Sequence, residues 1–310
     1  MIRQWSVNSG REVREPIQGN GRVRALALSG NRKWVVSGEL ELASVWNRNT
    51  WQKVFDVHEH TLEVLAVDIS PDSTKFATGA RDKKVFVWDI STGQRLFGPL
   101  EHVGNVVTVR FSPDGEYMAT ATWDHESLRI YSARTGQLIR SVQVKARGLN
   151  TIAWSSDSQR IFASSSNTIK HIYVGTGSVI TQWSAPALTN NAYGSLAVAN
   201  NGRILASFAG SCLSLWDLST CERLGPVFNH PNQRLWAIVF SLDNNYLATS
   251  GENGIITLRN LNDIVPMAYL VQRPHSSRGA NLTLQIEAFR GTLRTLESRF
   301  GVYLENPSCI

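Results

Sequence analysis

One short pattern returns along the chain at a nearly constant interval. It is a strand-like segment that ends on a large side chain, at Trp5, Trp46, Trp88, Tyr131, Tyr173, Trp216 and Arg259, with spacings of 41, 42, 43, 42, 43 and 43 residues. A second marker, a turn such as "ISPDS" or "FSPDG", begins at residues 28, 69, 111, 154, 198 and 240 and keeps the same period. Two independent markers with one period indicate a repeat protein.

Each repeat contains four short strands. In the second unit these are "VLAVDIS", "KFATGA", "KVFVWD" and "QRLFGP", which are rich in β-branched and aromatic residues and separated by turns of Pro, Asp, Gly and Ser. No segment before residue 274 has helical periodicity. Four antiparallel strands repeated about every 42 residues predict an all-β fold, a β-propeller whose neighbouring blades cover one another's apolar faces.

The repeats resemble those of the WD-repeat β-propellers, and the resemblance covers residues 1–272. The family holds its blades together with a hydrogen-bonded tetrad. In the second and third units the resemblance assigns this structural role to His60, Thr78, Asp82, Trp88, His102, Thr120, Asp124 and Tyr131. An Asp in a tight turn accepts backbone N–H groups, and a buried His or Trp needs a partner, so we interpret Asp82 and Asp124 as structural. Asp89 then simply ends a strand.

The two ends of the chain differ from the repeats. The N-terminus begins in the middle of a unit, so we expect six complete blades and a split or incomplete seventh. Residues 273–310 form a C-terminal extension, where an apolar stripe with spacings of 4, 3, 4, 3 and 4 runs from Leu282 to Phe300. The stripe predicts an amphipathic helix over 281–300, although "NLTLQIEAF" also alternates as a closing strand does. The helix would cover the propeller or dock to another chain.

The chain also resembles the tandem WD repeats of fungal NACHT-type NTPase proteins, where such propellers serve as sensors or scaffolds. A start in the middle of a unit and an end outside the repeats are also typical of a piece of a larger multidomain chain. No GxxxxGK[ST] loop is present in these 310 residues.

The search for chemistry favours no enzyme. The sequence has no GxSxG elbow and no GxGxxG loop, and His58 and His60 lie in one loop with His60 assigned to a tetrad. Three cysteines lack metal-like spacing. We therefore predict no catalytic residue, no metal and no cofactor.

Charge and hydropathy bear on the setting of the protein. No apolar run is long enough for a membrane span and no signal segment opens the chain, so we expect an intracellular protein, cytoplasmic rather than nuclear, without a membrane partner. The net charge is +6, and the first fifty residues carry eight Arg or Lys against four Asp or Glu. A solvated basic surface is the favoured reading of this excess, and nucleic acid is the alternative.

The resemblance implies a non-catalytic protein–protein interaction scaffold that binds a partner peptide or domain on one face. The family's contact positions are the residue before the turn Asp and the residue just before each first strand. In this chain these positions hold Arg81, Trp123, Arg22, Glu63, Asn105 and Arg234. Arg and Trp suit an acidic or phosphorylated peptide. The alternative function is a nucleic-acid-associated propeller that uses the basic N-terminal unit.

Overall fold

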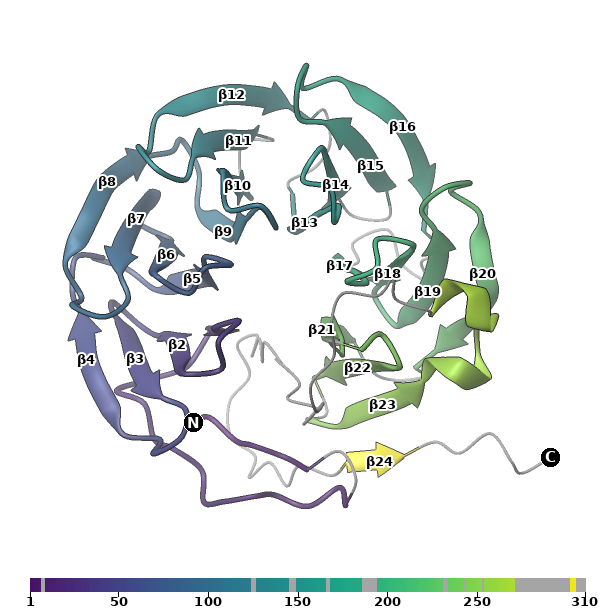
Figure 1. The fold of residues 1–310 in the computed structure, drawn as a ribbon, viewed down its shortest axis with the longest axis horizontal. Coiled ribbons are helices and arrows are strands. Elements are labelled where there is room, and N and C mark those ends of the chain that lie inside the picture. Colours follow the sequence, from purple (N-terminus) through teal and green to yellow (C-terminus); the bar gives the residue numbers. More distant parts are fainter. Residues whose placement is uncertain are drawn as a thin grey trace.

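The fold is a ring of β-sheets arranged around a central axis (Figure 1). The computed structural model describes residues 1–6, 9–123, 127–144, 149–165, 168–185, 194–230, 234–241, 243–252, 254–270 and 302–304. Within this part of the chain the strands form six four-stranded sheets, here called blades 1 to 6. This confirms the all-β propeller of six blades.

Blades 1 to 3 are antiparallel meanders formed from consecutive strands. Blade 1 contains β1 (Ala25–Leu28), β2 (Trp34–Gly38), β3 (Ala43–Asn47) and β4 (Lys53–Val57). Blade 2 contains β5 (Val64–Ile69), β6 (Lys75–Ala80), β7 (Lys84–Asp89) and β8 (Arg95–Glu101). Blade 3 contains β9 (Val106–Phe111), β10 (Tyr117–Thr122), β11 (Ser127–Ser132) and β12 (Leu138–Gln143).

Blades 4 and 5 repeat this order, and blade 6 departs from it. Blade 4 contains β13 (Thr151–Trp154), β14 (Arg160–Ser165), β15 (Thr168–Tyr173) and β16 (Val179–Ser184). Blade 5 contains β17 (Gly194–Val198), β18 (Ile204–Ala209), β19 (Cys212–Asp217) and β20 (Arg223–Asn229). Blade 6 contains β21 (Leu235–Phe240), β22 (Tyr246–Gly251), β23 (Ile256–Asn260) and β24 (Val302–Leu304).

Within the described residues, the sixth repeat does not supply its own fourth strand. After β23 the chain forms two 3-10 turns, η1 (Leu261–Asp263) and η2 (Met267–Tyr269). The place beside β23 is taken by β24, which pairs with it in parallel, whereas every other strand pair is antiparallel in the described sheets.

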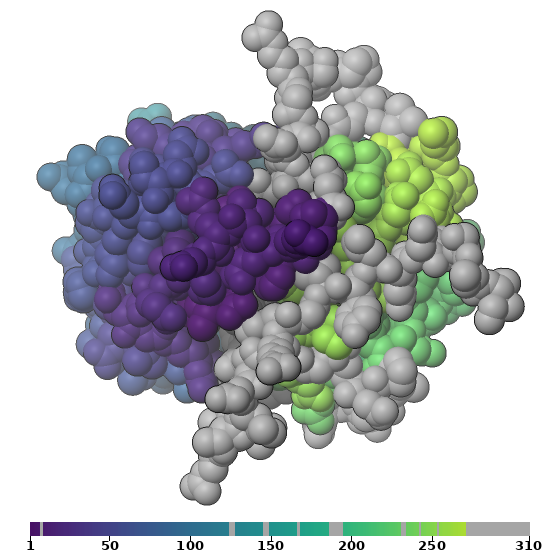
Figure 2. All heavy atoms as spheres, turned by 90° about the horizontal axis from the view of Figure 1, so that it is seen from below, coloured from purple at the N-terminus to yellow at the C-terminus, as the bar shows by residue number. Residues whose placement is uncertain are grey.

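The N-terminal residues lie at the position of a seventh blade, between blade 1 and blade 6 (Figures 1 and 2). Antiparallel bridges join Ile2 to Ile17 and Trp5 to Glu12, which gives the two-stranded segment expected for a split blade. Ile2 packs against Val35 of β2 in the core of blade 1. The predicted helix over 281–300 lies outside the described residues.

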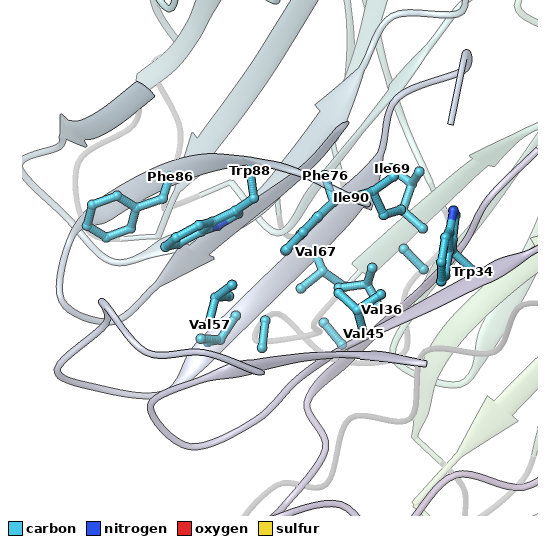
Figure 3. Close-up of a cluster of buried hydrophobic side chains, with 14 of the residues drawn as sticks. Trp34, Val36, Val45, Val57, Val67, Ile69, Phe76, Phe86, Trp88 and Ile90 are labelled. Atoms are coloured by element: carbon cyan, nitrogen blue, oxygen red, sulfur yellow. The ribbon is translucent and has the colours of Figure 1, made fainter. Parts of the chain in front are cut away.

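The hydrophobic core is divided into clusters that lie between consecutive blades. The cluster in Figure 3 joins Val36 and Val45 of blade 1 to Val67, Phe76 and Trp88 of blade 2. Similar clusters join blades 2 and 3, 3 and 4, 4 and 5, and 5 and 6. Since a single blade has no core of its own, the ring derives its stability from these shared interfaces.

The meander order defines two ends of the ring. One end carries the linkers between blades and the loops between the second and third strands, and we call it the linker face. The other end carries the turns between the first and second strands and between the third and fourth strands, and we call it the turn face. Each short stretch of sequence is therefore assigned to one of two surfaces by its place in the repeat.

Candidate functional site

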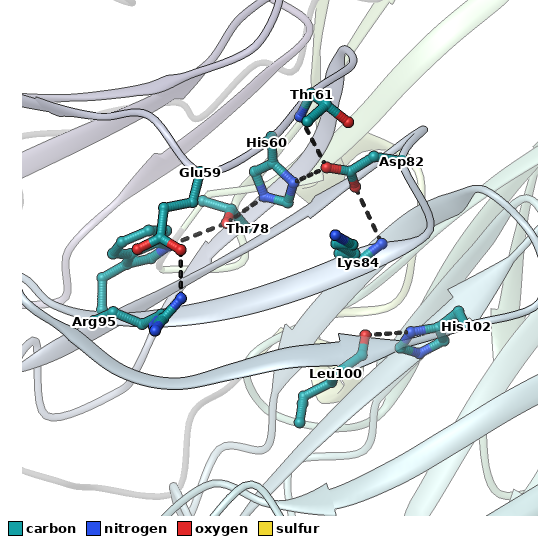
Figure 4. Close-up of polar contacts among 10 residues, drawn as sticks. Glu59, His60, Thr61, Thr78, Asp82, Lys84, Arg95, Leu100 and His102 are labelled. Atoms are coloured by element: carbon teal, nitrogen blue, oxygen red, sulfur yellow. Dashed lines mark hydrogen bonds and ion pairs between the residues drawn. The ribbon is translucent and has the colours of Figure 1, made fainter.

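The structure brings together the four predicted tetrad residues of blade 2, of which His60, Thr78 and Asp82 are labelled in Figure 4. Trp88 donates its indole N–H to Thr78 Oγ1 at 3.0 Å. The Thr78 hydroxyl lies 2.8 Å from His60 Nε2, and His60 Nδ1 lies 2.9 Å from Asp82 Oδ2. With Nδ1 protonated, each group donates to the next and the chain of donors ends on a carboxylate, so the bonds reinforce one another.

Asp82 also holds two loops of the linker face. Its carboxylate accepts the backbone N–H groups of Thr61 at 3.0 Å and Lys84 at 3.1 Å. Burial acts to raise the pKa of Asp82, but the hydrogen bonds from His60 and from these amides outweigh it, so the pKa lies below its ordinary value. The ionised carboxylate thus joins the linker before blade 2 to the loop between β6 and β7.

The order hydroxyl, imidazole and carboxylate is also that of a hydrolytic triad, but access rules out this role for blade 2. Thr78 is 0% exposed, and its oxygen already accepts the Trp88 N–H. A nucleophile must reach a substrate carbon, and this one is enclosed by the blade. Both imidazole nitrogens of His60 are also occupied, so neither is available to join His58 in binding a metal.

Asp89 does more than end a strand. Its Oδ1 accepts the backbone N–H groups of Ser91 and Thr92, both at 2.9 Å. Hydrogen bonds from Ser91 and Thr92 lower the pKa of Asp89, against a smaller opposing effect of burial. The side chain caps the turn between β7 and β8 on the turn face.

In blade 3 the structure brings together three of the four predicted residues. His102 Nε2 lies 2.8 Å from Thr120 Oγ1 and 3.3 Å from the Tyr131 hydroxyl. His102 Nδ1 donates to the Leu100 carbonyl at 2.9 Å. Burial lowers the pKa of His102 to about 4, so the ring is neutral near pH 7. Asp124 lies outside the described residues.

Blade 1 has a buried polar group that the sequence analysis missed. Trp46 Nε1 donates to Ser37 Oγ at 2.9 Å, and the Ser37 hydroxyl donates to Glu39 Oε1 at 3.0 Å. Glu39 is 0% exposed and also accepts the backbone N–H of Gly21 at 3.0 Å. Gly19 stands eighteen residues before Ser37, the same spacing that separates His60 from Thr78 in blade 2. A Cβ built on Gly19 would lie 2.7 Å from Glu39 Oε1. The Glu39 carboxylate therefore fills the space of the missing histidine, and a glycine at that spacing was the available signal.

The remaining blades keep part of the tetrad. In blade 5, Trp216 donates to Ser207 at 2.7 Å. In blade 6, Arg259 stands in the Trp position and lies 3.4 Å from Thr249 Oγ1 and 3.1 Å from His230 Nε2. In blade 4 the sequence alignment places Tyr173 at the Trp position, and this is wrong by one residue. The Trp position belongs to Ile172, which pairs with Ile161 in the same way that Trp88 pairs with Phe76 in blade 2.

The predicted contact residues lie on the linker face. Arg81, in the loop between β6 and β7, forms a 3.1 Å ion pair with Glu63, and its side chain is 52% exposed. Glu63 also binds Arg24 at 2.7 Å. Burial acts to raise the pKa of Glu63, but Arg24, Arg81 and then Arg22 lower it below its ordinary value. One carboxylate thus faces three guanidinium groups, of which that of Arg81 is half exposed.

Three blades share a backbone hydrogen bond that positions the contact residues. Trp123 N donates to Asn105 O at 3.1 Å, as Arg81 N donates to Glu63 O at 3.0 Å. In blade 6, Glu252 N donates to Arg234 O at 2.9 Å. Arg81 and Trp123 therefore occupy equivalent places on neighbouring blades, while Arg234 lies on the far side of the N-terminal segment.

The same face carries exposed apolar side chains that the sequence analysis did not single out. They are Leu40 of blade 1, Leu62 and Val103 in the linkers before blades 2 and 3, and Trp123, and each is between 42% and 55% exposed. We call these four residues the apolar arc. Their loop positions became apparent only when the strand bounds were known.

Two general features complete the description of the site. Among the described residues, no three His, Cys, Asp or Glu side chains gather as metal ligands do. Over that same part of the chain, no helix has the length and apolar character needed to cross a membrane.

Four-stranded blades held by such tetrads define a β-propeller of the WD type. The family model "WD domain, G-beta repeat" matches residues 51–89 and 222–260, and the model "Anaphase-promoting complex subunit 4 WD40 domain" matches residues 92–157. A comparison with curated proteins gave no match. The repeats within the matched residues, and the propeller fold that contains them, are those of the WD40-repeat family. Propellers of this family commonly act as protein-interaction scaffolds and are generally non-catalytic.

Proposed function

We propose that the protein is a non-catalytic scaffold that binds a segment of a partner protein on the linker face of blades 1 to 3. The observation that carries the proposal is the apolar arc. Large apolar side chains exposed together on neighbouring loops are unfavourable in water, and they commonly mark an interaction surface. Arg81 lies on blade 2, between the ends of the arc on blades 1 and 3.

The charges beside the arc favour a partner segment with an acidic or phosphorylated group. Three guanidinium groups, from Arg22, Arg24 and Arg81, surround the carboxylate of Glu63, and these loops also contain Asp82 and the exposed Glu41. The guanidinium of Arg81 is half exposed, so a carboxylate or phosphate can approach it and form charge-assisted hydrogen bonds. Apolar side chains of the same segment would cover Trp123 and Leu62.

The loops that carry these residues are held in place before binding. Asp82 holds the backbone of Thr61 and Lys84, which flank Leu62 and Arg81 closely in the sequence. Fixed loops lose little conformational entropy when a ligand binds. The tetrad thus supports binding indirectly, although it contacts no partner.

The double replacement Arg81→Ala with Trp123→Ala tests the binding face. We expect the melting temperature to change little, because about half of each side chain is exposed, and partner binding to weaken by about 2 kcal/mol. The measurement is capture of partners by the tagged full chain, identification by mass spectrometry, and titration of the purified partner by calorimetry.

A matched control removes one Arg and one exposed aliphatic side chain from the other end of the molecule. Arg134→Ala with Leu138→Ala alters blade 3 near the turn face and should leave partner affinity unchanged. If the Arg81/Trp123 variant binds every identified partner as tightly as the parent does, the binding face lies elsewhere. Residues 282 to 300 would then be the next segment to test.

A further inference from the structure

The turn face of blade 1 concentrates positive charge. Its two turns, residues 29–33 and 48–52, lie side by side because Arg48 N donates to Lys33 O at 2.8 Å. Together they contain Arg32, Lys33 and Arg48, and no Asp or Glu. The three cations are therefore close together with no acidic residue in either turn.

The absence of acid has a specific structural origin. In blades 2, 3, 4 and 6 an aspartate holds the turn between the first two strands, because its carboxylate accepts a hydrogen bond from a serine hydroxyl. These aspartates are Asp72, Asp114, Asp157 and Asp243. In blade 5, Asp217 caps the turn between the third and fourth strands. In blade 1 both places hold an amide. Asn31 accepts the Ser29 hydroxyl at 2.7 Å and Lys33 N at 3.0 Å, and Asn47 accepts Asn49 N at 2.9 Å. Blade 1 makes the same turns without their charge.

The N-terminal segment adds a fourth cation. The Arg14 guanidinium lies over the Trp51 ring, 5.7 Å from its centroid. Trp51 has a φ of 57°, in the left-handed region, where the corresponding turns of blades 2 to 4 have Gly93, Gly136 and Gly177. Residues with a side chain adopt this conformation uncommonly, and the corresponding turn of blade 5 has another, Cys221, with a φ of 60°. Trp51 therefore occupies a position whose backbone conformation favours glycine, and its ring packs beneath the Arg14 guanidinium.

We propose that this cationic patch, defined as Arg14, Arg32, Lys33 and Arg48, binds the phosphate backbone of double-stranded nucleic acid. Guanidinium and ammonium groups are the main phosphate ligands in such interfaces, and backbone contacts carry no sequence preference. The proposal is independent of partner binding on the linker face, since the patch lies at the opposite end of blade 1.

The aromatic residues near the patch favour a duplex over a single strand. Single-stranded nucleic acids stack their bases on exposed rings. Trp34 is buried with Lys33 above its ring at 4.5 Å, and Trp51 is only partly exposed beneath Arg14. Neither ring is open to a base, whereas a duplex presents its phosphates on the outside. The two turns also lack any large exposed apolar side chain that would enter a bilayer.

Binding of a labelled duplex DNA of arbitrary sequence to the full chain tests the proposal. Fluorescence anisotropy between about 50 and about 200 mM NaCl should give a log–log slope of about −3 to −4, as expected for four phosphate contacts. The variant Arg32→Gln, Lys33→Gln, Arg48→Gln should bind at least about tenfold more weakly at the lowest salt, with a slope shallower by about 3.

Two further proteins keep the test decisive. The control Lys83→Gln, Arg134→Gln, Arg223→Gln removes the same charge from exposed positions on blades 2, 3 and 5, and should retain the parent's affinity within about twofold. Lys33→Glu changes one exposed side chain and should weaken binding even if the triple variant folds poorly. Its melting temperature should match that of the parent.

Three outcomes would overturn the proposal. The first is binding of duplex DNA by the parent without a salt-dependent slope. The second is a control that loses as much affinity as the patch variant, which would indicate bulk charge alone. The third is binding of vesicles that contain anionic lipid, through the patch, with duplex DNA left unbound, which would assign the patch to a membrane surface.

Discussion

Replacing Asp82 by Ala should lower the free energy of unfolding by about 3 kcal/mol. The carboxylate is almost wholly buried and accepts hydrogen bonds from His60, Thr61 and Lys84. Its removal leaves three donors without their acceptor, and bonds to a charged group are worth about 1.5–3 kcal/mol each, partly offset when water enters the space. Urea unfolding followed by tryptophan fluorescence measures the change.

Glu59→Ala provides the matched control for this prediction. Glu59 is also a carboxylate of the linker before blade 2, but it is exposed and pairs only with exposed Arg95 among the interactions given by the structure. Surface pairs of this kind contribute about 0–1 kcal/mol. Unchanged unfolding of Asp82→Ala together with loss of partner binding would show that Asp82 belongs to the binding site and is not a structural residue.

The period of the sequence was sufficient to predict the ring. Two markers that repeat about every 42 residues leave few alternatives, because each marker recurs at the same place in a four-stranded blade. The second unit could be predicted in detail because His60, Thr78, Asp82 and Trp88 are all present at the family's spacing. The structure then joins them in one chain of hydrogen bonds.

The tetrad in blade 1 could not be predicted in the same way because another residue fills the same space. Glu39 lies two residues after Ser37, where pattern matching looks for neither a His nor an Asp, and its carboxylate reaches the space above Gly19. Only the structure shows that these two differences compensate each other. Spacing predicts which positions face inward, and it does not predict which side chain will fill a hole.

Sequence period also fails where loop length changes within a unit. The fourth unit places Ile172, and not Tyr173, beside Ile161, so that Tyr173 is exposed. One residue reverses the face of a strand, and a period of 41 to 44 residues tolerates such a shift. The exposed contact residues depend on loop bounds in the same way. The apolar arc was therefore recognisable only from the structure.

Stability should fall by about 3 kcal/mol as the pH is lowered from about 7 to about 4, through His102. Burial lowers the pKa of His102 to about 4, against an ordinary value of 6.5. The hydrogen bond to Leu100 O acts in the opposite direction, and Arg129 lowers the pKa further. The unfolded chain gains a proton at this site below pH 6.5 and the folded protein does not, so lower pH favours unfolding. The difference of 2.5 units corresponds to about 3 kcal/mol, all of it present above pH 6.5 and lost by pH 4.

His171 should add to this pH dependence in the same direction. It is buried in β15, stacked on Phe162 at 4.8 Å, and burial lowers its pKa, with Arg160 lowering it further against Asp157. The carboxylates with lowered pKa values, such as Asp82 and Glu63, act in a different window. Their contribution is complete above the ordinary carboxyl pKa and is lost only below about pH 4. The interval between pH 7 and pH 4.5 therefore isolates the histidines.

Urea unfolding at several pH values in this interval, on the parent and on His102→Gln, measures the effect. Gln keeps a donor and an acceptor but does not titrate, so the variant should be less stable at pH 7 and should lose stability less steeply as the pH falls. His58→Gln is the control, because His58 is exposed, and its profile should run parallel to that of the parent. A His102→Gln profile that also runs parallel to the parent would show that His102 takes up its proton in the folded protein. A carboxylate beside the ring, the place that the sequence assigns to Asp124, would have that effect.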